Sequence, residues 1–277
     1  MFETYSKRPG SLMIFFLMVL ASAITIGTIF SVVIYILANG VMHLSPQLFS
    51  LEYTAQNMSM LPAIITTAYM VVLSLALAVP VGVFAAIYLV EYSRKGSKIV
   101  RIIRVAIETL QGIPSIVYGL FGYIFFVISL GWSYSLIAGA VTLSVMVLPL
   151  IIRTTEEALL SVPDAYREGS FGLGAGRRQT VFKIILPCAV PGISAGIILA
   201  VGRIVGESAA LIFTAGTVAE VPESIFDSAR TLSVHMYALM SEGLNSDEAY
   251  ATAVVLLAMV IIINGLSSLI ARKITAR

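Results

Sequence analysis

The sequence predicts an all-α integral membrane protein with six transmembrane helices. Hydrophobic residues make up 58% of the 277 residues and charged residues 12%, about half the charged fraction of a typical soluble domain. The chain also contains runs without any Lys, Arg, Asp or Glu, at 9–51, 53–90, 109–152, 184–202 and 249–271. About 20 apolar residues in a helix cross the hydrocarbon core of a membrane, whereas a buried helix of a soluble protein would be shorter and amphipathic.

The first span is expected at 11–37. Lys7 and Arg8 precede it, as basic residues precede the apolar part of a signal peptide. The apolar run is too long for a signal peptide, however, and no cleavage site of small residues follows it. We therefore expect this helix to be retained.

Charges and turn residues delimit the other spans. Span two is expected at 62–90, ended by Glu91, and Gly131-Trp132-Ser133 divides the long uncharged run that follows. The remaining spans are expected at 106–129, 134–152, 188–214 and 250–271. We expect a single transmembrane domain over 1–277, with one long connection at 153–187.

Lysines and arginines gather on one side of the predicted membrane. Fifteen of the seventeen lie in the two termini or in the connections between spans two and three and between spans four and five. Because such residues are enriched in cytoplasmic loops, both termini are predicted to be cytoplasmic.

Arg230 belongs to the acidic segment 215–249, on the opposite side of the predicted membrane. A short amphipathic helix is expected there from Pro222 to Met236, with a solvated connector as the alternative.

Span five carries two charged residues, Arg203 and Glu207. With a rise of 1.5 Å per residue, Arg203 is expected roughly 18 Å beyond Pro191, near the bilayer centre, where an arginine costs about 2.5–3.5 kcal/mol. Glu207 follows one helical turn later and is expected to pair with it. Three small residues share the same stripe of the helix, namely Gly192, Gly196 and Ala200. We therefore expect this stripe to face protein or an aqueous path.

The connection at 153–187 is too long for a simple link, since most connections have about 4–6 residues. Pro163 followed by Asp164 predicts a short helix capped by Asp164. Glycines at 172, 174 and 176 allow the chain to reverse, and a second helix is expected from Thr180. A short helix held on glycine hinges suits docking to another protein.

This connection resembles the motif of inner-membrane permease subunits of bacterial ABC importers. The motif reads Glu-Ala-Ala, three residues, Gly, nine residues, Ile-x-Leu-Pro, and five of its positions are occupied here by Glu168, Gly174, Ile184, Leu186 and Pro187. Gly169 and Ser170 replace the two alanines. Since glycine weakens a helix by about 1 kcal/mol relative to alanine, the end of the docking helix is expected to be looser.

The resemblance implies a type I ABC importer permease fold with a coupling helix that sits in a cleft of a separate ATPase. The expected docking residues are Asp164, Ala165, Tyr166, Arg167, Glu168 and Gly174. The sequence has no Gly-x-x-x-x-Gly-Lys-Ser/Thr phosphate loop. ATP and Mg²⁺ are therefore expected on the partner, and this chain is predicted to be neither an enzyme nor the holder of a cofactor.

Over nearly its whole length the sequence resembles the PstA-type permease subunits of bacterial phosphate importers. The similar segments are 86–92, 112–122, 147–158 and 202–209. The resemblance implies a bacterial inner-membrane location and four kinds of partner: PstB-type ATPase subunits, a PstC-type second permease, a PstS-type extracytoplasmic phosphate-binding protein and membrane lipid. No nucleic acid is expected.

The resemblance also implies a substrate path. Arg203 is expected to line it, because a guanidinium stays charged and binds oxyanions with two prongs, while Glu207 holds and tunes it. A purely structural pair is the alternative interpretation. Ser115, directly after Pro114, either offers a hydroxyl to substrate at a helix break or belongs to a plain kink.

Other functional classes are weighed against the same residues. An ABC importer for another oxyanion or small solute would share the docking motif, whereas an ion-coupled secondary transporter predicts more intramembrane carboxylates or a paired repeat. His43 and His235 are too few and too far apart in sequence for a His-based metal site. No nucleophile–base pair is evident, so neither a catalytic nor a metal site is predicted.

Overall fold

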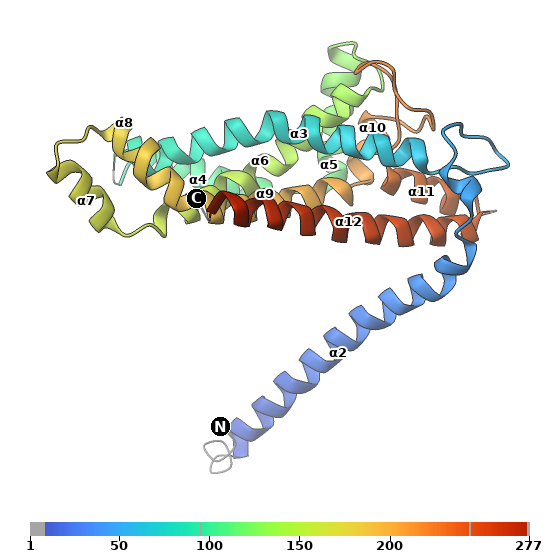
Figure 1. Ribbon diagram of the computed structural model, residues 1–277, viewed down its shortest axis with the longest axis horizontal. Helices are drawn as coiled ribbons and strands as arrows, with labels where there is room; N and C mark the ends of the chain where they lie inside the picture. The colour runs from blue at the N-terminus through green and yellow to red at the C-terminus, as the bar shows by residue number, and fades with distance from the viewer. Residues whose placement is uncertain (1–8, 95, 244, 276–277) are drawn as a thin grey trace.

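The computed structural model describes residues 9–94, 96–243 and 245–275, which form helices and connections without a strand. Four long helices run roughly along one axis (Figure 1): α3 (Leu61–Ile87), α6 (Leu136–Leu160), α9 (Leu186–Val205) and α12 (Ser246–Thr275). They pack α3 on α6, α6 on α9 and α9 on α12. In the described part, five helices are long and apolar enough to cross a membrane, and a bent pair forms a sixth candidate. The predicted all-α membrane fold is confirmed.

The remaining elements are shorter, apart from the first helix. They are α2 (Pro9–Gly40), 3-10 turns Val41–His43 and Pro46–Phe49, the π turn Tyr88–Tyr92, α4 (Lys98–Gln111), α5 (Ser115–Gly122), the π turn Tyr123–Ser129, α7 (Asp164–Gly172), α8 (Arg177–Thr180), the π turn Val181–Ile185, α10 (Ala209–Thr214) and α11 (Leu232–Glu242). Four of the cations in the charge count, Lys7, Arg8, Lys95 and Arg277, lie outside the described residues.

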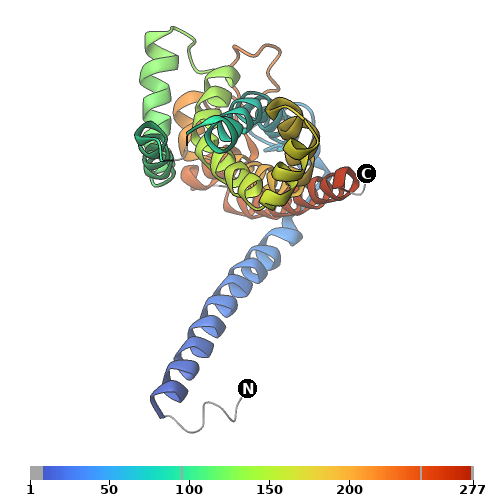
Figure 2. The same ribbon diagram turned by 90° about the vertical axis from the view of Figure 1, so that its left-hand side faces the viewer.

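Helix α2 stands apart from the bundle. In Figures 1 and 2 it diverges from the other helices and meets them only near its C-terminal end. There the ring of Tyr35 meets that of Tyr250 edge to face, with centroids 5.8 Å apart, and Gly40 lies against the backbone of Tyr250. Its apolar side chains are exposed along most of its length. Such a surface suits lipid or a second membrane chain.

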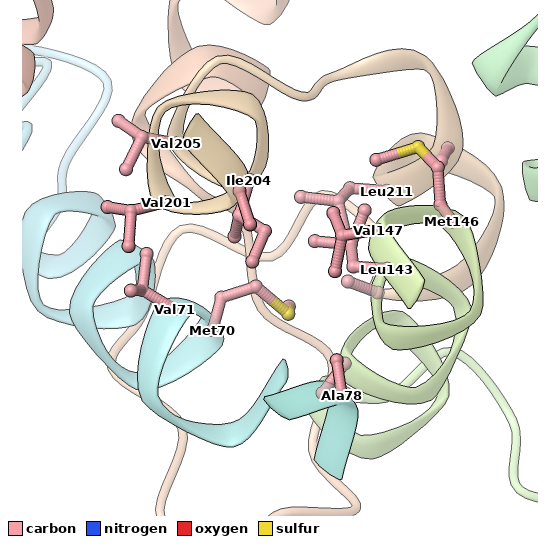
Figure 3. Close-up of a cluster of buried hydrophobic side chains, with 14 of the residues drawn as sticks. Met70, Val71, Ala78, Leu143, Met146, Val147, Val201, Ile204, Val205 and Leu211 are labelled. Carbon is pink, nitrogen blue, oxygen red and sulfur yellow. The ribbon is translucent and has the colours of Figure 1, made fainter. Parts of the chain in front are cut away.

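Apolar side chains from α3, α6, α9 and α10 fill the centre of the bundle (Figure 3). Met70 of α3, Leu143 and Val147 of α6, Ile204 of α9 and Leu211 of α10 all point into this cluster and are fully buried. Because lipid tails are as apolar as these side chains, close van der Waals packing is what favours the assembled bundle in a membrane.

Small residues bring α9 against α6. A Cβ atom added to Gly192 would lie 2.6 Å from Cβ of Ala158, and one added to Gly196 would lie 2.6 Å from Cβ of Thr154. Both distances are too short for real contacts, so only glycine permits this approach. The expectation that the small-residue stripe of span five faces protein is confirmed for these two glycines.

The third predicted span, at 106–129, corresponds to a bent pair of helices with an earlier start. The chain forms α4 and α5 there, which are bent by 101° at the break between Gln111 and Ser115. Pro114 explains the break, because proline lacks a backbone N–H and disfavours helical backbone in the residue before it. Helix α4 starts earlier than expected and exposes Ile99 and Ile102 beside Arg101, an arrangement typical of a membrane–water interface.

Spans four and five also differ from the prediction. Span five, expected at 188–214, divides into α9 and α10 because Gly206 turns the chain. Helix α6 continues eight residues beyond the expected end at 152, and its extension carries the Arg153–Glu157 ion pair, 2.7 Å between Nε and Oε1.

The helix expected from Pro222 to Met236 is also wrong, since α11 begins only at Leu232. The chain before it is held as a loop, in which the N–H groups of Ala229 and Arg230 donate to the carbonyls of Ala215 and Val218. Because these two N–H groups donate to the loop, they do not form the hydrogen bonds of a helix.

Replacing Gly196 with alanine should destabilise the α6–α9 contact, because the new Cβ would overlap Thr154. Overpacking of this kind costs about 1–3 kcal/mol, to be measured as a lower melting temperature of the protein in nanodiscs. Gly202→Ala on the same helix is the matched control, since nothing lies within 4 Å of its added Cβ. Equal melting temperatures for the two variants would contradict the packing described.

Candidate functional site

Two helix breaks lie against each other inside the bundle. Helices α5 and α10 each begin directly after a break, and they pack together. The approach is close: a Cβ added to Gly119 would lie 2.8 Å from Cα of Ala210. Interrupted helices at membrane depth need protein or water around their free backbone groups, and membrane transporters commonly bind solutes at such points. We therefore take this junction as the candidate site.

Arg203 lies in the last turn of α9, next to the junction. It is half-buried, and no hydrogen bond or ion pair engages its guanidinium within the described residues. Its charge acts on Tyr118 of α5, whose hydroxyl donates to the Leu110 carbonyl at 2.8 Å across the α4–α5 bend. The guanidinium therefore keeps its donors for water or for an anionic ligand.

The expected pairing of Glu207 with Arg203 is wrong. Gly206 ends α9 before Glu207, so the two residues do not lie one helical turn apart. The Glu207 carboxylate instead accepts the N–H of Ala210 at 3.1 Å and stabilises the start of α10. Its backbone carbonyl accepts the hydroxyl of Ser233 at 2.5 Å. Arg203 is thus left without a neutralising carboxylate among the described side chains.

Ser115 is the first residue of α5 and lies at the other break. It is half-buried, and its hydroxyl has no hydrogen-bond partner within the part of the chain that the structure describes. The position of Ser115 directly after Pro114 predicted a helix break, and this break is confirmed. Its contact with a substrate stays a prediction.

A second feature lies at the far end of the bundle, where α7 and α8 form a lobe (left end of Figure 1). Asp164 is the first residue of α7 and not its cap: Pro163 precedes it without a side-chain hydrogen bond, and Asp164 pairs with Arg167 at 3.1 Å. Ala165, Tyr166 and Glu168 are exposed on the lobe. Gly174 has φ +83°, which allows the chain to turn after α7.

Arg167 points inward and anchors the lobe. Its Nη2 and Nε lie 2.7 and 3.1 Å from Oε1 of Glu91, and it also donates to the carbonyls of Leu159 and Val162. Both partners are largely buried, with side chains 15% and 9% exposed. This arginine therefore ties α7 to the ends of α3 and α6. Glu91 was expected only to end span two, because a local pattern does not reveal a partner 76 residues away.

The two departures from the alanine motif have different effects. Gly169 is exposed, as a looser helix end would allow. Ser170 is buried, and its hydroxyl lies 2.8 Å from that of Thr180. This hydrogen bond joins α7 to α8, so the serine offsets part of the looseness expected from its neighbour.

Further ion pairs hold the same end of the molecule together. Arg104 contacts Glu156, which is almost fully buried, and Arg153 pairs with Glu108 across helices at 3.2 Å. Two of the arginines that indicated orientation thus also link α4 to α6.

Comparisons with known proteins place these features in context. Residues 78–277 match the protein family described as binding-protein-dependent transport system inner membrane component. The chain is 35% identical to the probable ABC transporter permease protein YqgI of Bacillus subtilis (strain 168), covering 93% of this chain and 95% of that protein. It is 36% identical to the phosphate transport system permease protein PstA of Mycobacterium leprae (strain TN), over 56% of this chain and 51% of that protein. The inward-facing MetNI methionine ABC transporter aligns with a TM-score of 0.61 at 25% identity, over 78% of this chain and 94% of that one.

Arg167→Gln should release the lobe, because Glu91 is then left buried without its partner. Breaking a buried ion pair from one side costs about 3–5 kcal/mol, so amide hydrogen exchange over residues 164–180 should become faster. Arg178→Gln is the control, since Arg178 is exposed and makes no ion pair in the described structure. Exchange as slow as in the unmodified protein would show that Arg167 is not the anchor.

Proposed function

The chain belongs to the binding-protein-dependent transport system inner membrane components and is a permease subunit of an ABC importer, and we propose that it carries inorganic phosphate into the cell. The family assignment follows from the match over 78–277 and from a permease relative aligned over nearly the full length. The phosphate assignment is supported by the PstA relative, which aligns over about half of its length, and above all by the unpaired Arg203.

Arg203 supplies what an oxyanion path needs. A guanidinium remains charged at all relevant pH values and matches two oxygens of a phosphate at once. A charge in the interior of a membrane protein is costly, and here no carboxylate of the described residues neutralises it. A phosphate ion passing the junction would offset that cost. The unengaged hydroxyl of Ser115, at the break facing α10, offers a further donor.

The lobe of α7 and α8 is proposed to dock on a separate ATPase subunit in the cytoplasm. The N-terminal end of α2 and the C-terminal end of α12 lie in the same half of the molecule as this lobe (Figure 1). This placement agrees with the orientation that the basic residues predict. Tyr166, Phe171 and Leu173 expose apolar surface there, and Leu173 is 91% exposed. Exposed apolar side chains of this kind anchor protein interfaces.

Closure of the ATPase would reach the substrate junction through packed helices. Arg167 and Glu91 tie α7 to the end of α3, and α3 packs against both α6 and α9. Because α9 carries Arg203 at its far end, a displacement of the lobe shifts the elements around the junction. Alternation between outward and inward access would follow, with ATP and Mg²⁺ bound by the partner.

Two more partners complete the proposal. An extracytoplasmic phosphate-binding protein would deliver the anion, because the acidic segment 215–249 does not favour capture of a free anion. A second permease subunit of the PstC type would pair with this one, for which the uncovered length of α2 offers surface.

Arg203→Gln should lower phosphate uptake by about tenfold or more, since a hydrogen bond to a charged group contributes about 1.5–3 kcal/mol. The assay is ATP-dependent uptake of labelled phosphate by proteoliposomes that contain both permeases, the ATPase and the binding protein. Arg101→Gln, at an exposed position outside the lobe, should transport normally, and both variants should reach wild-type membrane levels. Normal uptake by Arg203→Gln would refute its role, and equal competition by sulfate or molybdate would refute phosphate as the substrate.

Leu173→Asp should weaken docking, because it places a charge on the most exposed apolar side chain of the lobe. We expect copurification of the ATPase with the permease to fall severalfold while the permease itself remains folded. Gln179→Asp adds the same charge at an exposed position nearby and should have little effect. Undiminished copurification with Leu173→Asp would place the ATPase contact elsewhere.

A further inference from the structure

Arg230 is a buried arginine without an acceptor. It lies just before α11, in the part of the chain predicted to be extracytoplasmic, and is 6% exposed. Its guanidinium carbon lies 4.5 Å from the ring centroid of Tyr53. Its Nε and Nη2 atoms are buried and have no hydrogen-bond partner, and no ion pair engages it, among the described residues.

This arrangement does not satisfy a guanidinium. The face of an aromatic ring attracts a cation. This attraction does not replace the hydrogen bonds that the N–H groups of a guanidinium form in its plane. A buried charge normally has both a counter-charge and hydrogen bonds, because desolvation otherwise exceeds what a single contact returns. The chemistry at Arg230 therefore calls for an anionic acceptor.

His235 belongs to the same cluster. It is fully buried and meets the ring of Tyr53 edge to face with centroids 6.0 Å apart. Among the described residues neither ring nitrogen has a hydrogen bond of good geometry, although the Met58 backbone lies close enough to act on the imidazole. Burial, together with the charge of Arg230, lowers the pKa of His235 to about 3, although the Met58 backbone opposes the shift. The imidazole is thus neutral near pH 7 and offers one donor and one acceptor nitrogen.

The cluster adjoins the substrate junction. Thr231 and Ser233 follow Arg230, with their hydroxyl oxygens 3.1 Å apart, and Ser233 donates to the Glu207 carbonyl at the α9–α10 break. The first N–H of α11, that of Leu232, donates to Oγ1 of Thr67 on α3 at 2.9 Å. Helix α11 therefore begins two residues after Arg230 and is joined to α3 by this hydrogen bond.

We propose that Arg230 and His235 form a second binding site, for a protonated tetrahedral oxyanion, on the entry side of the Arg203 junction. The proposal rests on the proposed function, in which an oxyanion moves past Arg203. The guanidinium would donate to unprotonated oxygens, and the acceptor nitrogen of the neutral imidazole would take the hydrogen of a P–OH group. Sulfate carries no such hydrogen near pH 7, so this pair favours phosphate over sulfate.

The cluster is closed in this structure, so binding requires that the segment before α11 open. The side chains of the closed cluster come from two distant segments. Tyr53 belongs to the connection before α3, Arg230 lies just before α11, and His235 lies in the first turn of α11. An oxyanion bound between these side chains would link the connection before α3 to the start of α11. This link would depend on the charge of Arg230.

The test is equilibrium binding of labelled phosphate to the complete transporter in nanodiscs, without the binding protein. We expect Arg230→Gln to lose one bound phosphate per complex, Arg203→Gln to lose another, and the double variant to lose both. Arg230→Gln with wild-type stoichiometry and affinity would overturn the proposal and leave the role of Arg203 intact. Loss in Arg230→Gln alone, with none in Arg203→Gln, would instead remove the support for Arg203.

Selectivity provides a readout that a merely structural role would not change. In the wild type, arsenate should displace phosphate from this site and sulfate should not, because arsenate keeps a hydrogen near pH 7. His235→Phe retains a ring against Tyr53 but has no acceptor, so sulfate should gain at least tenfold relative to arsenate. Unchanged selectivity in His235→Phe would overturn the proposed recognition.

Two more variants guard against a folding artefact. Arg230→Lys keeps the charge, so it should assemble normally, but it should bind about tenfold more weakly because the two-pronged contact is lost. Tyr237→Phe removes a hydroxyl from an exposed tyrosine of α11, outside the cluster, and should bind phosphate normally. Wild-type affinity in Arg230→Lys would argue against direct contact with the anion.

Discussion

The need to satisfy every backbone polar group inside a membrane governs this structure. Continuous helices meet most of that need by themselves, and α3, α6 and α12 are of this kind, although α3 and α6 each contain one internal proline. Two breaks, before α5 and before α10, are tolerated because these helices pack together and the Glu207 carboxylate accepts the N–H of Ala210. The breaks also bring Arg203 close to Tyr118 of α5, so the candidate substrate site lies where the helices are interrupted.

Among the described residues, the arginines that are at least partly buried fall into two groups. Near the lobe they are paired: Arg167 with Glu91, Arg104 with Glu156, and Arg153 with Glu108. The last two pairs connect α4 to α6, and Arg167–Glu91 attaches the lobe to the end of α3, the connection through which the proposed movement of the ATPase would pass. Arg203 and Arg230, at the other end, have no acidic partner among the described residues. An unpaired cation is costly in a structural role, and in the proposed function an anionic substrate would offset that cost.

Particular elements show how far sequence reasoning reached. Pro114 predicted a helix break, but not the 101° bend that follows from it. The glycines of span five predicted a face toward protein, and Gly196 does lie against Thr154 of α6. Glu207 was misjudged because a helical wheel assumes an unbroken helix, and Gly206 ends it. Arg167 was expected on the docking surface, since nothing near it in sequence reveals that Glu91 holds it inward.

The sequence by itself determined the membrane class, the approximate number of spans and the docking-loop motif. These properties depend on hydropathy and spacing along one segment, which need no knowledge of neighbours. Only the tertiary structure decided which charges are paired, where two breaks meet, and that Arg230 and His235 are buried against Tyr53. Those outcomes join residues far apart in the chain. They depend on the packing of whole helices, which local patterns do not encode.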